Sequence, residues 1–163
     1  TGLSYLLVNA PTPYFMGHSW YNIPPGDPNP GIDNSVNILL NIIENIKDQG
    51  YQYRDILLLG FSQGGCIVLE TLYKLHHPIG GVAALSPRIY EERLPKEFAP
   101  ILDTPLFVAH GEYDDVIPCS QTEAGTNYLS SFFKATKFNS YNIGHEISIE
   151  EIESLRNWIN QRI

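Results

Sequence analysis

Basic residues are scarce in this 163-residue sequence. It has 10 lysines and arginines against 18 aspartates and glutamates, a formal net charge of −8. Nucleic acids and anionic membrane surfaces both favour clusters of lysine and arginine. The composition therefore argues against either as the main partner, whereas a small neutral substrate is compatible with it.

Cysteines and long apolar runs are also few. The two cysteines, Cys66 and Cys119, lack metal-ligand or redox spacing, and we interpret both as reduced packing residues of a cytoplasmic protein. No cluster of ligating residues indicates a metal or redox enzyme, so no metal or cofactor is expected. No apolar run approaches transmembrane length and no signal peptide is visible, which argues against integral membrane association.

The length and the 43% hydrophobic content predict a single domain over residues 1–163, with a substantial core. The first residue is Thr1 rather than methionine, and the apolar stretch 5–8 follows almost at once. We therefore expect the chain to begin inside a longer protein.

Apolar runs alternate with stretches of helical periodicity along the chain. The predicted strands are 3–8, 56–59, 80–86, 105–110 and 137–141. The predicted helices are 33–48, capped by Asp33 or Asn34, then 64–75, 120–133 and 149–163. This alternation predicts an α/β fold with a mostly parallel sheet and helices on both faces.

The segment Gly60-Phe61-Ser62-Gln63-Gly64 follows one predicted strand and opens a helix. It fits G-x-S-x-G, the nucleophile elbow, in which glycines let the strand and helix cross closely and a strained serine is exposed. The N–H of Gln63 would face a developing oxyanion at the helix N-terminus. The plainer alternative is a glycine-rich turn with an idle serine.

A serine nucleophile needs a base and a carboxylate that orients the base. In the elbow fold the chain order is Ser, then Asp or Glu, then His, each after a strand, and Ser62, Asp114 and His145 meet that pattern. Spacing alone leaves Glu112 and Asp115 open as the carboxylate, and His110 is a weaker candidate for the base. Alternatively, Asp114 caps a turn and His145 is an ordinary loop residue.

The segment 14–30 is rich in aromatic residues, proline and glycine, and it follows the predicted strand 3–8. Loops at the carboxyl ends of strands build the sites of α/β proteins. We expect Phe15, Trp20 and Tyr21 to form part of an apolar wall for a substrate, with a lid that only covers the core as the alternative.

Several motifs together resemble the phospholipase/carboxylesterase family of α/β-hydrolases, which includes acyl-protein thioesterases and small bacterial carboxylesterases. They are Leu7-Val8-Asn9-Ala10-Pro11, Ser19-Trp20-Tyr21-Asn22-Ile23, Gly60-Phe61-Ser62-Gln63-Gly64-Gly65, the segment from His110 to Pro118, and Gly144-His145. The resemblance covers essentially the whole chain. It implies the α/β-hydrolase fold, Ser62 as nucleophile, Asp114 as carboxylate and His145 as base. It also implies that Trp20 lies beside the active site and that Gln63 N–H is an oxyanion donor.

One family feature has no counterpart here. Members carry an earlier strand that ends in a Leu-His-Gly-x-Gly-like loop, which supplies the second oxyanion N–H and lies between the counterparts of 3–8 and 56–59. We therefore expect an N-terminally truncated form of the fold. The chain is a fragment, or its remaining strands close up, or a partner chain fills the gap.

These features predict a serine hydrolase that cleaves carboxylic esters or thioesters of short to medium acyl chains through an acyl-enzyme. The alternative is a weakly active or inactive hydrolase-like module that acts in binding or assembly, because loss of one oxyanion donor typically lowers turnover by about 10²–10³-fold. The substrate, ester or thioester preference and oligomeric state, a homodimer included, stay open.

Overall fold

The computed structural model describes residues 2–97, 101–133 and 135–162 of the chain. Thr1 and Ile163, which belong to the segments considered above, lie outside the described residues. Four parallel strands form the main sheet, in the order β3-β4-β5-β6. Their bounds are β3 (Leu57–Phe61), β4 (Gly81–Leu85), β5 (Leu106–Gly111) and β6 (Thr136–Tyr141).

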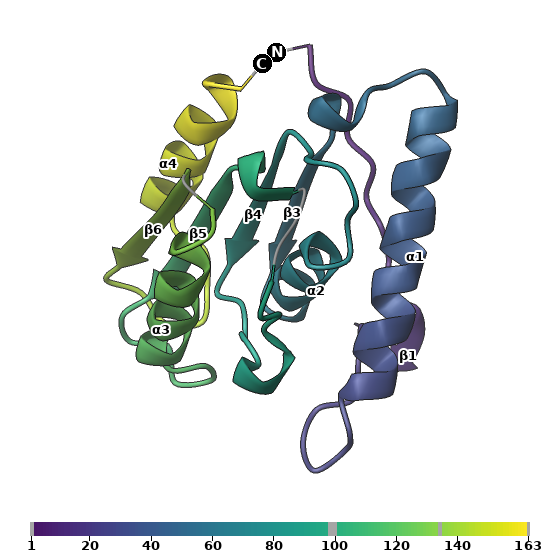
Figure 1. The fold of residues 1–163 in the computed structure, drawn as a ribbon. Helices are drawn as coiled ribbons and strands as arrows, with labels where there is room; N and C mark the ends of the chain where they lie inside the picture. Colours follow the sequence, from purple (N-terminus) through teal and green to yellow (C-terminus); the bar gives the residue numbers. More distant parts are fainter. Residues whose placement is uncertain (1, 98–100, 134, 163) are drawn as a thin grey trace.

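Helices follow the strands and cover both faces of this sheet, as the sequence predicts (Figure 1). They are α1 (Asn29–Asp48), α2 (Gln63–Leu72), α3 (Cys119–Ser130) and α4 (Ile149–Asn160). The helix α1 begins earlier than expected, because Pro28 already has helical backbone angles and a proline is tolerated in the first turn. Its end at residues 49–50 matches the prediction, with Gly50 at φ 101°.

Alternating side chains of the strands divide the core into two layers. Val82 and Ala84 of β4 pack with apolar residues of α1, α2 and α3, whereas Ala83 and Leu85 pack with Leu155 and Trp158 of α4. Both strands in the middle of the sheet, β4 and β5, are buried along their whole length. Burial on both faces explains why these two strands read as continuous apolar runs rather than as an alternating pattern.

The predicted strand 3–8 is not a strand in the structure. Residues 3–10 belong to no strand or helix, and among the described residues β3 pairs with β4 alone. This segment runs between β3 and α1 (Figure 1). The sequence pattern was misleading because an apolar stretch records only a tendency to be buried, while a strand also needs a neighbour for its backbone groups. The idea that the remaining strands close up directly is therefore wrong for this structure.

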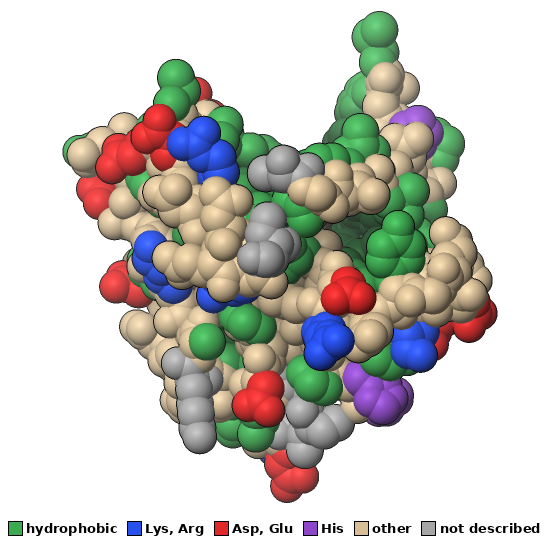
Figure 2. Space-filling view, turned by 90° about the horizontal axis from the view of Figure 1, so that it is seen from above, with side chains coloured by type: hydrophobic (Ala, Val, Ile, Leu, Met, Phe, Trp, Pro, Cys, Tyr) green, Lys and Arg blue, Asp and Glu red, His purple; other side chains and the backbone are tan. Residues whose placement is uncertain are grey.

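A hollow remains along the open edge of β3. One part, of about 330 Å³, is lined by residues of the segment 4–8, by α1 and by residues 55–58. A second part, of about 250 Å³, is bordered by Leu6, Leu59 and Trp20. Figure 2 shows hydrophobic side chains around a hollow on the face seen from above. The open edge of β3 is thus apolar.

A short antiparallel hairpin precedes α1, and the sequence analysis did not predict it. Its strands are β1 (Thr12–Tyr14) and β2 (Gly17–Ser19). The segment between residues 87 and 103 contains two short 3₁₀ turns at Glu91–Arg93 and Ile101–Asp103. Among the residues that the structure describes, no helix combines the length and apolar character needed to cross a bilayer.

Candidate active site

Ser62 lies in the turn between β3 and α2, with φ 55° and ψ −118°. Few residues other than glycine adopt a positive φ, so this backbone is strained, as expected for a nucleophile elbow. Gly60 allows the tight turn, because a Cβ atom there would lie 2.2 Å from the carbonyl carbon of Gly64. Gln63 is the first residue of α2, where a backbone N–H has no partner within the helix.

Asp114 and His145 lie in the loops that follow β5 and β6, next to this turn. The two loops are joined by backbone hydrogen bonds from Glu112 N–H to Tyr141 O and from Tyr113 N–H to Ile143 O, of 2.8 and 3.0 Å. Gly111 permits the approach, since a Cβ atom there would meet the Gly144 carbonyl oxygen at 2.2 Å. The carboxylate and the imidazole are therefore held together by their loops.

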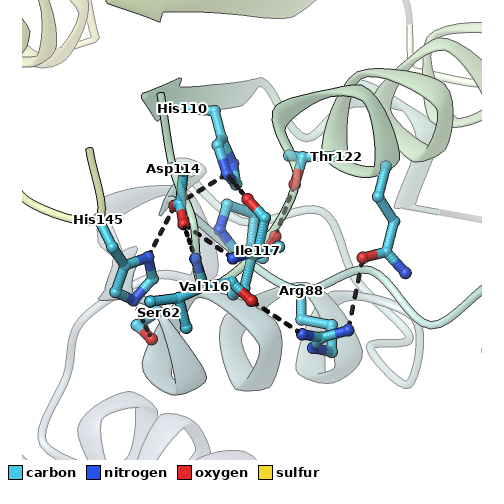
Figure 3. A network of polar contacts seen from close by, with 10 residues as sticks. Ser62, Arg88, His110, Asp114, Val116, Ile117, Thr122 and His145 are labelled. Atoms are coloured by element: carbon cyan, nitrogen blue, oxygen red, sulfur yellow. Dashed lines mark hydrogen bonds and ion pairs between the residues drawn. The ribbon is translucent and has the colours of Figure 1, made fainter. Parts of the chain in front are cut away.

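The three side chains form one continuous chain of hydrogen bonds (Figure 3). Ser62 Oγ lies 2.8 Å from Nε2 of His145, and Nδ1 of His145 lies 2.7 Å from Oδ2 of Asp114. The Asp114 carboxylate can only accept a hydrogen bond, so Nδ1 of His145 donates to it and carries the proton of the neutral ring. Nε2 is then free to accept the proton of Ser62. This arrangement can transfer a proton from Ser62 to His145.

The other oxygen of Asp114 accepts hydrogen bonds from the backbone N–H groups of Val116 and Ile117, at 2.9 and 2.8 Å. Burial alone would raise the pKa of Asp114, but these amides and His145 outweigh it and hold the pKa below its ordinary value. The carboxylate is therefore ionised at neutral pH and can stabilise a positive charge on His145.

The two competing carboxylates face elsewhere. Glu112 accepts a hydrogen bond from Ser140 Oγ at 2.7 Å, and Asp115 is exposed to solvent. The competing base, His110, is fully buried behind Asp114 and not next to Ser62. Geometry thus separates candidates that spacing along the chain left open.

The side chain of Gln63 fastens the elbow to the segment after β2, a role that the sequence analysis missed. Its Oε1 accepts from Trp20 N–H at 3.0 Å and from Ser19 Oγ at 3.1 Å, and its Nε2 donates to Tyr21 O at 3.1 Å. The aromatic pattern of this segment signalled proximity to a site, but nothing in it identified the partner of Gln63.

The three predicted wall residues have different positions. Trp20 is half-buried beside the elbow, with its indole nitrogen 3.6 Å from where a Cβ on Gly64 would lie. Tyr21 is instead a core residue, 5% exposed and packed edge-on against Tyr90. Its ring joins the apolar cluster formed by residues of α1 and α2, where it is shielded from water. Phe15 is 92% exposed at the hairpin turn, where it contacts Tyr14. Tyr21 is therefore a core residue rather than part of a shared aromatic wall, whereas a wall role for Trp20 and Phe15 stays a prediction.

No group of three or more histidine, cysteine, aspartate or glutamate side chains in the described ranges is arranged to hold a metal ion. Neither cysteine forms a disulfide, and Cys66 is buried in the core. Burial raises the pKa of the Cys66 thiol to about 12, so it is unreactive at neutral pH.

Known proteins share this sequence pattern and this fold. Lysophospholipase-like protein 1 of Mus musculus is 30% identical over 139 residues, which cover 81% of this chain and 57% of the relative. Acyl-protein thioesterase 1 of Kluyveromyces lactis is 29% identical over 142 residues, covering 82% and 61%. The crystal structure of SOBER1 from Arabidopsis thaliana superposes with a TM-score of 0.76 at 24% identity, over 90% of this chain and 74% of that one.

This chain spans 57% and 61% of the lengths of those two curated relatives. The structural likeness establishes the α/β-hydrolase fold that the sequence predicts. The family model described as phospholipase/carboxylesterase matches residues 4–163, nearly the whole sequence. The chain therefore belongs to the phospholipase/carboxylesterase family.

Proposed function

We propose that this chain carries the catalytic serine, base and carboxylate of a hydrolase that cleaves carboxylic esters or thioesters. The observation that supports this most directly is the chain of hydrogen bonds from Ser62 through His145 to Asp114. A buried and ionised carboxylate behind a histidine that faces a partly exposed, strained serine is the arrangement that acyl transfer requires.

The reaction follows from this geometry. Ser62 Oγ attacks the acyl carbon while its proton passes to Nε2 of His145, and the oxyanion that forms faces Gln63 N–H. The intermediate collapses, and His145 returns the proton to the departing alcohol or thiol, which leaves an acyl ester on Ser62. A water molecule then gives a proton to His145 and attacks this ester. His145 then passes this proton to Ser62 Oγ as the bond to the acyl carbon breaks, which releases the acid and restores the serine hydroxyl and the neutral imidazole.

The finer features of the proposal are the substrate and the location. We propose ester or thioester substrates, in keeping with relatives named as a thioesterase and a probable carboxylesterase. We further propose acyl chains of short to medium length, with Trp20 as the aromatic residue beside the acyl group. The two unpaired thiols suit a reducing compartment such as the cytoplasm.

A second candidate is a hydrolase-like module that binds or assembles and turns over weakly. The open edge of β3 favours this candidate, because the unpaired backbone groups of an edge strand are a template for another chain. Weak turnover would follow if Gln63 N–H acts without a second oxyanion donor.

A fluorophosphonate probe that phosphonylates activated serines separates the two candidates. We expect one probe per chain in the intact mass spectrum of the purified protein. Labelling should be absent in Ser62→Ala and in His145→Ala. No labelling of well-folded protein, or labelling that persists in Ser62→Ala, would contradict the hydrolase proposal. Active protein would then be profiled on matched esters and thioesters of increasing chain length.

A further inference from the structure

Asp114 is contacted by two histidines, and only one of them faces the serine. Oδ2 of Asp114 lies 2.7 Å from Nδ1 of His145 and 3.1 Å from Nε2 of His110. The same Nε2 of His110 lies 2.8 Å from the carbonyl oxygen of Ile117. The side chains of His110 and Asp114 are both fully buried, whereas that of His145 is partly exposed. His110 has no role in the mechanism described above.

The protonation of His110 follows from its neighbours. A carbonyl oxygen can only accept, so Nε2 of His110 carries a proton that it donates to Ile117. Burial lowers the pKa of His110 despite the nearby carboxylate, so the ring is neutral and this proton is its only one on nitrogen. Nδ1 is buried and has no hydrogen-bond partner among the described residues. One N–H group is therefore the main polar link of this ring to its surroundings.

That link acts on the turn that holds the carboxylate. The N–H groups of Val116 and Ile117 bind Oδ1 of Asp114, and the Ile117 carbonyl binds His110. The positive end of the His110 N–H also lies beside Oδ2, the oxygen that accepts from His145 (Figure 3). The carboxylate is thus held at one oxygen by the turn and flanked at the other by two imidazoles.

We propose that His110 is a positioning residue, whose Nε2–H fixes the turn from Asp114 to Ile117 and so keeps the carboxylate aligned with His145. Its effect on rate rests on the proposed hydrolase function, whereas its effect on the Asp114–His145 hydrogen bond does not. His110 does not face Ser62 and takes no proton from it.

Two substitutions at residue 110 separate the role of the N–H from that of the ring's volume. In His110→Gln the side-chain amide reaches the place of Nε2 and can donate to Ile117. In His110→Asn the amide reaches only the place of Nδ1, so the donor is lost while the side chain stays polar. Should His110→Asn not fold, His110→Met replaces it, because methionine fills the space without a donor.

Arg88 provides a matched control. It donates to the Val116 carbonyl of the same turn, at 3.3 Å and from the solvent side, and nothing in the structure joins it to Asp114 Oδ2. Arg88→Met therefore loosens the turn from outside without removing the buried donor.

The first readout is the NMR resonance of the Nδ1 proton of His145, assigned by its absence in His145→Ala. We expect it in the wild-type chain, in Arg88→Met and in His110→Gln, and expect it to be lost through solvent exchange in His110→Asn. The second readout is the rate of phosphonylation of Ser62, which should fall at least tenfold in His110→Asn and less than threefold in His110→Gln.

The proposal is overturned if the Gln and Asn variants behave alike, whether both keep the resonance or both lose it. A purely structural role would lower the melting temperature of both variants without separating them. If the wild-type chain shows the resonance but does not react with the probe, the hydrolase function fails. The NMR comparison still decides the role of His110 in that case.

Discussion

The carboxyl end of β3 and its unpaired edge differ sharply in how completely they are packed. At its carboxyl end, Ser62, Asp114 and His145 are joined by hydrogen bonds of 2.7 and 2.8 Å, and the loops that carry them are bonded to each other. Along the edge that faces away from β4, β3 has no strand partner among the described residues, and Leu7 and Leu59 are 91% and 56% exposed. A site built from strand ends can therefore be ordered while the sheet beside it stays open.

The physical reason lies in where each region finds its partners. The candidate active site depends on β3, β5 and β6 and on the loops that follow them, all present in the sheet. The side of β3 needs a neighbouring strand to satisfy its backbone groups and cover its apolar residues. The elements that order the triad are thus different from those that would complete the edge.

Removal of the buried carboxylate should produce the largest effect at the packed end. For Asp114→Asn we expect phosphonylation of Ser62 to slow by about 10³–10⁴-fold, because the amide favours the wrong tautomer of the histidine. Stopped-flow labelling measures this rate. Asp115→Asn is the control, since that neighbouring carboxylate is exposed. Equal losses in both variants would refute the choice of Asp114.

The turn itself should not tolerate a methyl group at Gly60. In Gly60→Ala the new Cβ would lie 2.2 Å from the backbone of Gly64, and we expect a loss of about 3 kcal/mol in the free energy of unfolding. Urea denaturation followed by circular dichroism gives this value. Gly17→Ala, whose new Cβ would have its nearest neighbour at 3.9 Å, should cost far less. A small loss at Gly60 would mean that the elbow is looser than the structure indicates.

The hydrogen bonds of the Gln63 side chain connect the packed end to the segment after β2. Gln63→Leu removes all three of these hydrogen bonds and leaves the Trp20 N–H and the Tyr21 carbonyl without this partner. We expect it to lower the free energy of unfolding by about 2 kcal/mol. Denaturation in urea measures the loss, and Gln121→Leu on the exposed side of α3 is the control. If the two variants have the same free energy of unfolding, the hydrogen bonds of the Gln63 side chain contribute nothing to stability.

Acid should weaken the packed end through Asp114. Its pKa is lowered in the folded state, so its ionisation stabilises the fold above the unfolded-state value of about 3.9. That contribution disappears as the pH falls through the lower, folded-state value. The wild-type chain should therefore lose more stability between pH 6 and pH 3 than Asp114→Asn does, as measured by thermal unfolding. Parallel curves would contradict this assignment.

The smallest effect is expected along the open edge. Leu59→Ala should lower the free energy of unfolding by less than about 1 kcal/mol, because the side chain is 56% exposed. Leu106 in β5 is fully buried, so Leu106→Ala should lower the free energy of unfolding by about 2–5 kcal/mol. A comparison of both variants by urea denaturation tests whether the edge is open in solution. Equal losses would show that something covers Leu59.

The alternation of strands and helices was predictable because it depends on local periodicity. The strands β4 and β5 and all four helices lie where the sequence places them, within a few residues. The strand predicted at 3–8 failed for a non-local reason, since its pairing depends on a neighbour that the pattern cannot report. Tyr21 failed similarly, because an aromatic residue in a loop can equally well turn into the core.

By itself, the sequence determined the strand, turn and helix around Ser62, because these are encoded in residue types at short spacing. It also determined the chain order of serine, acid and histidine, because each of them follows a segment that can be recognised as a strand. Only the tertiary structure decided which carboxylate meets His145, that His110 lies behind Asp114, and that Gln63 binds the segment 19–21. The contacts of His145 and Gln63 join residues distant in the chain, and packing of the parallel strands is what brings them together, whereas His110 and Asp114 are four residues apart and meet through the turn after β5.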